Sequence, residues 1–443
     1  MQPSRVSAPS GRPRRGAALY LSLPILAWAL YDFANTIFAS NIITIFFPFY
    51  LKDTIGGSET ANQIAGTFIT YTNALSSVFL VLLSPLYGVW IDRTGRKKAY
   101  LVPFTLACVV STALMGAAAG YWQTDRTIAG LPLPLAAVLL LFMIAKFTYN
   151  SCLVFYDAMI SDLGREREIP LISGFGVATG YIGTLVGLCV YPLVGENLYH
   201  RSFLPSALLF LLFSLPIFLW YKEPRPESAP GPKPSFFSGY REIAATFREA
   251  RDYRPLFLFM IAYFFFNDAV ATAITVMGVY ATTVIGFTAK QFILLYLVST
   301  VSSIIGSFAF GYVTRSLGSK RSVSLVALVM IAAIALASLA FSEAVFWAAG
   351  SLYGVAMGAM WVASRTMIVE LSPPDKRGQF FGLFAFSGKV SSIVGPLLYG
   401  SVTWALAGYG NIASRIALGS LLVLVMIGLL FHLRVPYGPK RSS

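Results

Sequence analysis

Six ionisable side chains stand inside long apolar stretches of this 443-residue chain. Three are acidic and three are basic: Asp32, Lys146, Asp157, Asp268, Arg365 and Lys389. A charge at the centre of a membrane helix costs about 2.5–3.5 kcal/mol, so such residues are expected to face a cavity or one another. Their balanced signs suit a small zwitterionic or polar ligand better than a purely cationic one.

Some of these charges lie on regular stripes along expected helices. Lys146, Asn150 and Asp157 are spaced i, i+4 and i+11, which places them on one helical face. When the sequence is shifted by 208 residues (365 − 157), Asp157 aligns with Arg365, so opposite charges occupy matching places. Either these two residues form a gating pair between the halves of the protein, or each pairs within its own half.

Two of the acidic residues stand close to carboxamides, in Tyr31-Asp32-Phe33-Ala34-Asn35 and in Asn267-Asp268. A carboxylate that is partly removed from water can exchange a proton at physiological pH. It can equally bind a substrate ammonium group, or pair with a basic residue for stability, and all three roles stay open. Lys146 and Lys389 are suited to hold a substrate carboxylate. The predicted site for substrate and proton comprises Asp32, Asn35, Lys146, Asn150, Asn267, Asp268 and Lys389.

Patterns typical of catalysis are missing from the sequence. His200 and His432 are isolated, and Cys108, Cys152 and Cys189 lack metal-ligand or redox spacing. There is no nucleotide-binding loop and no Ser/His/Asp arrangement. We therefore expect no catalytic residue, no cofactor and no metal site, and we expect the energy to come from an ion or solute gradient. A membrane-embedded enzyme or a pore is the alternative of another class.

The composition is that of a membrane protein. Hydrophobic residues make up 56% of the chain and charged residues 12%, against about a quarter charged in soluble proteins. The net charge of +14 collects in tails and short connections, as the positive-inside rule requires. It therefore indicates topology, with some attraction to anionic lipid, and predicts no nucleic-acid partner.

A helix needs roughly 20 apolar residues to cross a membrane. Twelve runs of this kind occur, and an even number places both termini on one side, which the basic residues indicate is the cytoplasm. They begin near Pro24, Asn62, Ala99, Leu131, Pro170, Phe203, Pro255, Ala289, Ser322, Ala344, Gly378 and Ile412.

Two related basic turns lie half a chain apart. The first is Gly88-Val-Trp-Ile-Asp92-Arg93-Thr94-Gly95-Arg96-Lys97-Lys98, and a degenerate copy begins 223 residues later (311 − 88) with Gly311-Tyr-Val-Thr-Arg315. The first closely resembles the loop between helices 2 and 3 of the major facilitator superfamily. The resemblance implies an all-α membrane protein of twelve helices in two pseudo-symmetric six-helix bundles. It also implies gating roles for Asp92, Arg93 and Arg96 beside Asp157 and Arg365.

In that superfamily, helices 1, 4, 7 and 10, with 2, 5, 8 and 11, line the central cavity. All six intramembrane charges fall on such helices. The helices that would face lipid carry none in their interior, apart from Arg415 near one end of the last. This partition is the strongest sequence argument for a transport cavity.

Several further blocks resemble the vacuole-effluxer-like branch of the superfamily. They are Tyr31 to Asn35, Leu153 to Ala158, Ser173 to Tyr181, Ala262 to Asp268, and Ser364 to Lys389. The family usually has Trp where this chain has Phe33, and Asn is common where it has Asp157. The branch includes a fungal vacuolar amino-acid effluxer, so the resemblance implies release of amino acids or similar metabolites.

We therefore predict a secondary transporter working by alternating access, with a small-molecule substrate and H⁺ as the coupling ion. It is expected to be a monomer in the cytoplasmic membrane, in contact with lipid. A lipid or lysolipid flippase is the main alternative, and a transporter-like receptor is a third. The predicted domains are a basic tail (1–23), a six-helix half (24–221), a cytoplasmic linker with an amphipathic helix (222–254), a second six-helix half (255–433) and a basic tail (434–443).

Overall fold

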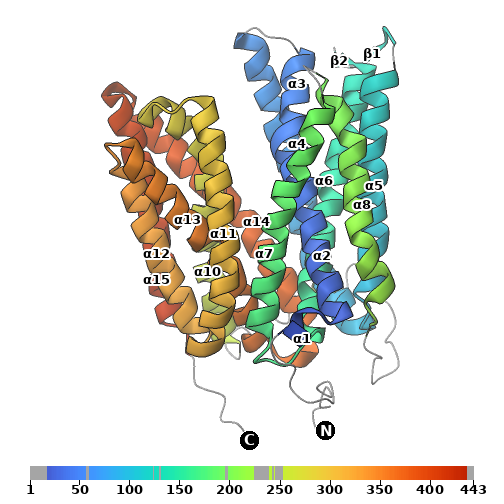
Figure 1. The fold of residues 1–443 in the computed structure, drawn as a ribbon, viewed down its shortest axis with the longest axis vertical. Coiled ribbons are helices and arrows are strands. Elements are labelled where there is room, and N and C mark those ends of the chain that lie inside the picture. The colour runs from blue at the N-terminus through green and yellow to red at the C-terminus, as the bar shows by residue number, and fades with distance from the viewer. Residues whose placement is uncertain are drawn as a thin grey trace, which may run out of the picture. The chain divides into compact units, whose positions relative to one another are not determined.

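The computed structural model describes residues 17–55, 59–122, 124–128, 131–194, 198–223, 239–241, 244 and 253–436. Nearly all of these residues are helical (Figure 1). The amphipathic helix predicted within the linker 222–254 lies almost wholly outside the described residues, as do most of both basic tails.

The N-terminal half begins with α1 (Ala17–Tyr20) and α2 (Leu23–Phe38), and α2 continues through a π-helical stretch (Ala39–Phe46) into α3 (Phe47–Ile55). A two-residue hairpin, β1 (Thr127–Ile128) and β2 (Leu131–Pro132), connects the third and fourth long helices. The remaining helices of this half are α4 (Glu59–Thr94), α5 (Lys98–Tyr121), α6 (Leu133–Met159), α7 (Ile169–Gly187) and α8 (Phe203–Trp220).

The C-terminal half repeats the plan with six long helices. They are α10 (Arg254–Tyr280), α11 (Ala289–Leu317), α12 (Ser319–Ser338), α13 (Glu343–Leu371), α14 (Arg377–Ala405) and α15 (Asn411–Leu433). The twelve expected helix starts agree with these bounds to within a few residues.

Eleven helical segments of the described chain are long and apolar enough to cross a membrane. The predicted second span falls on α4, which is 36 residues long but is not among the eleven. Its first half carries many Thr, Ser and Asn residues. Because a helix satisfies its own backbone hydrogen bonds, it is the form in which an apolar segment can cross lipid.

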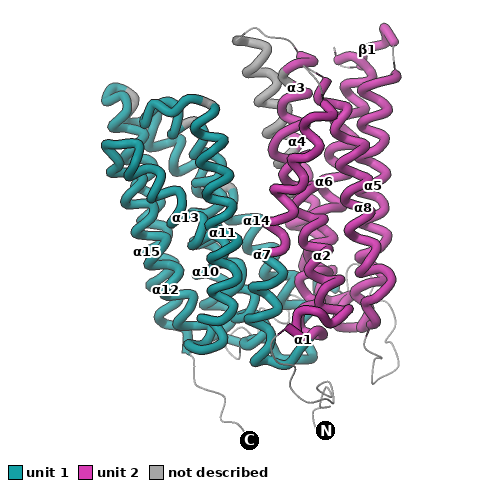
Figure 2. Tube along the Cα trace, in the orientation of Figure 1, with its two compact units in different colours: residues 1–9, 164–178, 234–443 teal, residues 10–163, 179–233 magenta. Residues whose placement is uncertain are grey.

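Contacts divide the chain into two compact units (Figure 2). Unit 2 contains residues 10–163 and 179–233, whereas unit 1 combines residues 164–178 with residues 234–443. The boundary falls inside α7, whose first half packs with the C-terminal helices.

Aromatic side chains fill the core of unit 2. Phe47 and Phe142 stack with ring centroids 3.6 Å apart. Trp28 stacks on Tyr156 at 4.7 Å, and its indole Nε1 donates to the Tyr156 carbonyl at 3.1 Å. This hydrogen bond satisfies the polar end of a fully buried indole.

Small residues bring α11 and α13 together in unit 1. The Ser299 hydroxyl donates to the Gly350 carbonyl at 2.9 Å, and the Ser303 hydroxyl donates to Gly354 at 2.8 Å. A Cβ atom on Gly354 would overlap the Ser299 carbonyl. Small residues with serine hydrogen bonds are a usual way for membrane helices to associate.

Candidate functional site

In unit 2, glycines of α7 face the polar side of α2. A Cβ atom on Gly180 would lie 3.1 Å from Asp32 Oδ2, and the Thr36 hydroxyl donates to the Gly180 carbonyl. Seven residues further along α7, about two helical turns, Asn41 Nδ2 donates to the Gly187 carbonyl at 2.9 Å. The crossing therefore places Asp32 against α7 without a side chain between them.

In unit 1, α14 crosses α10 in a corresponding way. Asn267 Nδ2 donates to the Gly388 carbonyl at 2.7 Å and to Ser391 Oγ at 2.8 Å. The Tyr263 hydroxyl donates to Asn267 Oδ1 at 3.3 Å. The predicted site residue Asn267 thus joins two helices, and all its polar atoms are engaged.

The two crossings match residue for residue. Gly180 corresponds to Gly388 at the 208-residue offset (388 − 180), and Gly187 corresponds to Gly395 at the same offset. The residues that face these glycines then show which positions of α2 and α10 correspond. Gly180 faces Asp32 and Thr36, whereas Gly388 faces Tyr263 and Asn267; Gly187 faces Ile37 and Asn41, whereas Gly395 faces Asp268 and Thr272.

Each of these four pairs differs by 231 residues (267 − 36). Asp32 therefore occupies the place of Tyr263, and Asp268 occupies the place of Ile37. The two acidic residues lie on equivalent helices, as the sequence indicates, but at different depths along them. Asp268 lies five residues further along its helix than the position that corresponds to Asp32 (268 − 263), and unit 2 has the uncharged Ile37 at that place.

Asp268 is fully buried on α10. Its Oδ1 accepts a hydrogen bond from the Gly395 backbone N–H at 2.7 Å. Its Oδ2 has no hydrogen-bond partner, and no basic side chain pairs with it among the described residues. An unpaired buried carboxylate is costly in its charged form, so this group is suited to take up a cation or a proton.

Two predicted carboxamides are also buried without full hydrogen bonding. Asn35 is 1% exposed, and neither its Nδ2 nor its Oδ1 has a partner in the described chain. Asn150 is 2% exposed, and its Nδ2 likewise has none. Buried amides are normally satisfied, so these two groups are candidates for contact with a solute.

The other predicted charges are only partly accessible, and all are engaged in interactions within the protein. Asp32 and Arg365 are each 8% exposed. Lys146, Asp157 and Lys389 are half-buried. The pairing of Asp157 with Arg365 stays a prediction.

The first basic turn is closed by a left-handed glycine. α4 ends at Thr94, and Gly95 follows with φ of 65°, its N–H donating to the Ile91 carbonyl at 2.8 Å. Such a residue after a helix end is typically glycine. Of the predicted gating residues in this turn, Asp92 and Arg93 are half-buried and Arg96 is exposed.

The charged cluster beside this turn was not predicted. Lys97 Nζ lies 2.6 Å from Asp162 Oδ2, with both side chains less than one-fifth exposed. The Tyr221 hydroxyl donates to the same oxygen at 2.6 Å. Burial, and secondarily the Asp162 charge, raise the pKa of Tyr221 well above its usual value, so the phenol remains a donor. The three residues come from three distant segments of the chain, which no local sequence pattern links.

Unit 1 has a corresponding cluster at the end of α11. The Ser319 hydroxyl donates to Glu370, and Lys320 Nζ donates to the carbonyls of Leu433 at 3.2 Å and Val435 at 2.7 Å. In unit 2, Lys98 Nζ similarly donates to the Tyr221 carbonyl after α8, at 2.9 Å. A lysine thus binds the carboxyl end of the last helix in each half, where the helix dipole favours a cation.

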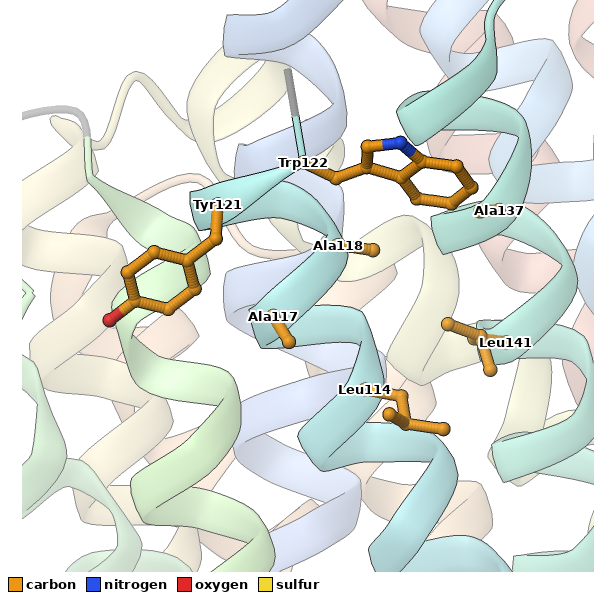
Figure 3. Close-up of a pocket in the computed structure, with 7 residues that line it drawn as sticks. All are labelled: Leu114, Ala117, Ala118, Tyr121, Trp122, Ala137 and Leu141. Carbon is orange, nitrogen blue, oxygen red and sulfur yellow. The ribbon is translucent and has the colours of Figure 1, made fainter. Parts of the chain in front are cut away.

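One cavity of about 390 Å³ lies between α5 and α6 (Figure 3). It is lined by Leu114, Ala117, Ala118, Tyr121, Trp122, Ala137 and Leu141. None of these residues is charged, and none belongs to the predicted site. Within the described chain, no group of three or more His, Cys, Asp or Glu residues could hold a metal ion.

The fold is shared with solved transporters. A human organic anion transporter, MFSD10, superposes with a TM-score of 0.73 at 14% identity, over 95% of this chain and all of that one. The proton:xylose symporter XylE superposes with a TM-score of 0.68 at 15% identity, over 94% of each chain. These likenesses show the major facilitator fold.

Sequence relatives extend along most of the chain. An uncharacterised MFS-type transporter of Bacillus subtilis, YxiO, is 26% identical over 93% of this chain and 94% of its own length. Autophagy-related protein 22-1 of Aspergillus niger is 24% identical over 62% of this chain and about half of its own length, 49%. The family and its relatives are transporters of the major facilitator superfamily rather than enzymes. The model of the family described as "Vacuole effluxer Atg22 like" matches residues 24–442, so this chain belongs to the Atg22-like family of major facilitator transporters.

Proposed function

We propose that this chain is a secondary active transporter that exports a small polar or zwitterionic solute, such as an amino acid. It works by alternating access, and a proton is the coupling ion. The main observation that supports this proposal is the full burial of Asp268, one of whose carboxyl oxygens has no partner in the described chain. A membrane protein keeps such a group for an ion or substrate pathway.

The proposed solute contacts use the neutral and basic groups of the predicted site. Asn35 and Asn150 have unsatisfied amide atoms, which can bind the ammonium or carboxylate of an amino acid. Lys146 and Lys389 supply positive charge for the carboxylate once their present interactions are exchanged. The family description, vacuole effluxer, supports the direction of efflux.

The proton is assigned to Asp268 because no basic side chain of the described chain neutralises it. Protonation removes the cost of the buried charge, and release on the other side of the membrane restores it. Coupling follows if the two protonation states favour different conformations of the transporter. We further propose that the protein is a monomer in the cytoplasmic membrane, with both termini in the cytoplasm.

Flux of radiolabelled amino acids into proteoliposomes, with and without a proton gradient, tests this proposal. Wild type is compared with Asp268→Asn, and with Asp125→Asn as a control that removes an exposed carboxylate between α5 and β1. We expect gradient-driven flux in wild type and in the control, and its loss in Asp268→Asn. Failure of every amino acid to move under either condition contradicts the proposal and directs attention to translocation of fluorescent lipids.

A further inference from the structure

We infer that Asp268, Thr272 and the backbone of α14 around Gly395 form a binding site for a dehydrated sodium ion. The inference rests on the proposed coupling role of Asp268, and it adds a second ion that competes with the proton for the same carboxylate. It is carried by three oxygen atoms from two helices of unit 1.

The first oxygen is Asp268 Oδ2. The other carboxyl oxygen is fixed by the Gly395 N–H at 2.7 Å, which orients the group and leaves Oδ2 without a partner in the described chain. A carboxylate held in this way within a membrane needs a neutralising cation.

The second oxygen is the hydroxyl of Thr272, which is fully buried and has no partner in the described part of the protein. Most buried threonines of the described chain bond to their own helix, although Thr314 also has no partner there. Thr105, Thr112 and Thr300 are also buried in helices, and each donates to the carbonyl four residues earlier at 2.8 Å. Thr272 instead lies against Gly395, where a Cβ atom would overlap its hydroxyl and would stand 2.7 Å from Asp268 Oδ1. The carboxylate and the hydroxyl are therefore neighbours, and Gly395 keeps the space between them free of a side chain.

The third oxygen is a backbone carbonyl of α14. Pro396 lies inside this helix and has no N–H, so the carbonyl of Ser392 loses its usual helical donor. Ser392 lies three residues before Gly395, whose N–H binds Asp268, and freed backbone carbonyls are among the groups with which transporters coordinate sodium.

A proton needs only one carboxyl oxygen and one acceptor. The site offers a carboxylate, a hydroxyl and a carbonyl, which together form an oxygen set of the kind that hard cations prefer. The site therefore has more oxygen atoms than a proton requires, and their number suits a small monovalent cation. The matching place in unit 2 has Ile37 where unit 1 has Asp268, so that half offers no such set.

Binding of radioactive sodium to the purified full-length protein tests the inference directly, with choline replacing unlabelled sodium. Thr272→Val removes the hydroxyl and keeps the shape of the side chain. Thr300→Val is the matched control, because that hydroxyl is equally buried but is already bonded to its own helix. We expect wild type and Thr300→Val to bind sodium, Thr272→Val to bind at least about tenfold more weakly, and Asp268→Asn to bind none.

Flux measurements separate this inference from the proposed function. An inward sodium gradient at equal pH should drive amino-acid flux in wild type but not in Thr272→Val, whereas a proton gradient should drive flux in both. Absence of sodium binding to wild type, with proton-driven flux intact, overturns the sodium site alone. So does sodium binding by Thr272→Val that equals wild type. Sodium binding without amino-acid flux under either gradient supports the site and contradicts the proposed function.

Discussion

Gly174 on α7 and Gly311 on α11 lie backbone against backbone. A Cβ atom on Gly174 would stand 3.0 Å from Gly311 Cα and 2.7 Å from the Ser307 carbonyl oxygen. Both glycines belong to unit 1, although Gly174 comes from the N-terminal half of the sequence. This contact explains why residues 164–178 pack with the C-terminal helices.

Gly174→Ala should therefore separate α7 from α11. The added methyl group meets backbone atoms that cannot rotate away, so we expect a loss of about 1–3 kcal/mol, as for other overpacked sites. Gly419→Ala on α15 is the control, because a Cβ atom there meets nothing within 4 Å. Alanine favours a helix by about 1 kcal/mol over glycine. Thermal unfolding in detergent should lower the midpoint for the first variant and leave or raise it for the second.

Asn267→Leu should weaken the crossing of α10 and α14. The substitution removes three hydrogen bonds, those to Gly388 and Ser391 and the one from Tyr263, and a typical intramolecular hydrogen bond contributes about 0.5–1.5 kcal/mol. Ser391→Ala removes only one of these bonds and should show a smaller effect. Thermal midpoints of the two variants, measured beside wild type, check the order; equal midpoints would contradict the assigned contacts.

Lys97, Asp162 and Tyr221 should act as a unit. Each substitution, Lys97→Met or Tyr221→Phe, removes a partner from the same carboxylate oxygen. Hydrogen bonds to charged groups contribute about 1.5–3 kcal/mol. A double-mutant cycle with Asp162→Asn should give a coupling free energy above 0.5 kcal/mol, as for residues within one hydrogen-bonded network. Simple additivity would show that the three residues are independent.

The predicted pairing of Asp157 with Arg365 is open to a charge-swap test. If the pair closes a gate, Asp157→Arg and Arg365→Asp should each abolish transport, and the double variant should recover part of it. Proteoliposome flux measures the recovery. Flux that stays absent in the double variant, despite normal insertion and folding, would favour separate pairing within each half.

Helix positions were predictable because their signals are local. A run of about 20 apolar residues indicates each span. A glycine beside several charged residues indicates the turn at Gly95. The buried acids and amides Asp268, Asn35 and Asn267 were predictable for a related reason, since a polar residue within an apolar run already indicates a special role.

Partners and registers were not predictable in the same way. Asp162 meets Lys97 and Tyr221 only because three helix ends converge. Asp268 lies opposite Gly395 because of the register of α14 relative to α10. This register depends on the packing of the two helices and cannot be read from either segment alone. The role of Thr272 was not predictable either, because the sequence does not show that its hydroxyl lacks a hydrogen-bond partner in the described chain.

The register of the two halves also bears on stoichiometry. Where unit 1 has Asp268, unit 2 has the uncharged Ile37, so the duplicated framework offers this ion position once rather than twice. One cation would then enter the cell for each solute molecule that is exported. For a zwitterionic amino acid, each export cycle would carry one net positive charge into the cell, so an inside-negative membrane voltage would help to drive export.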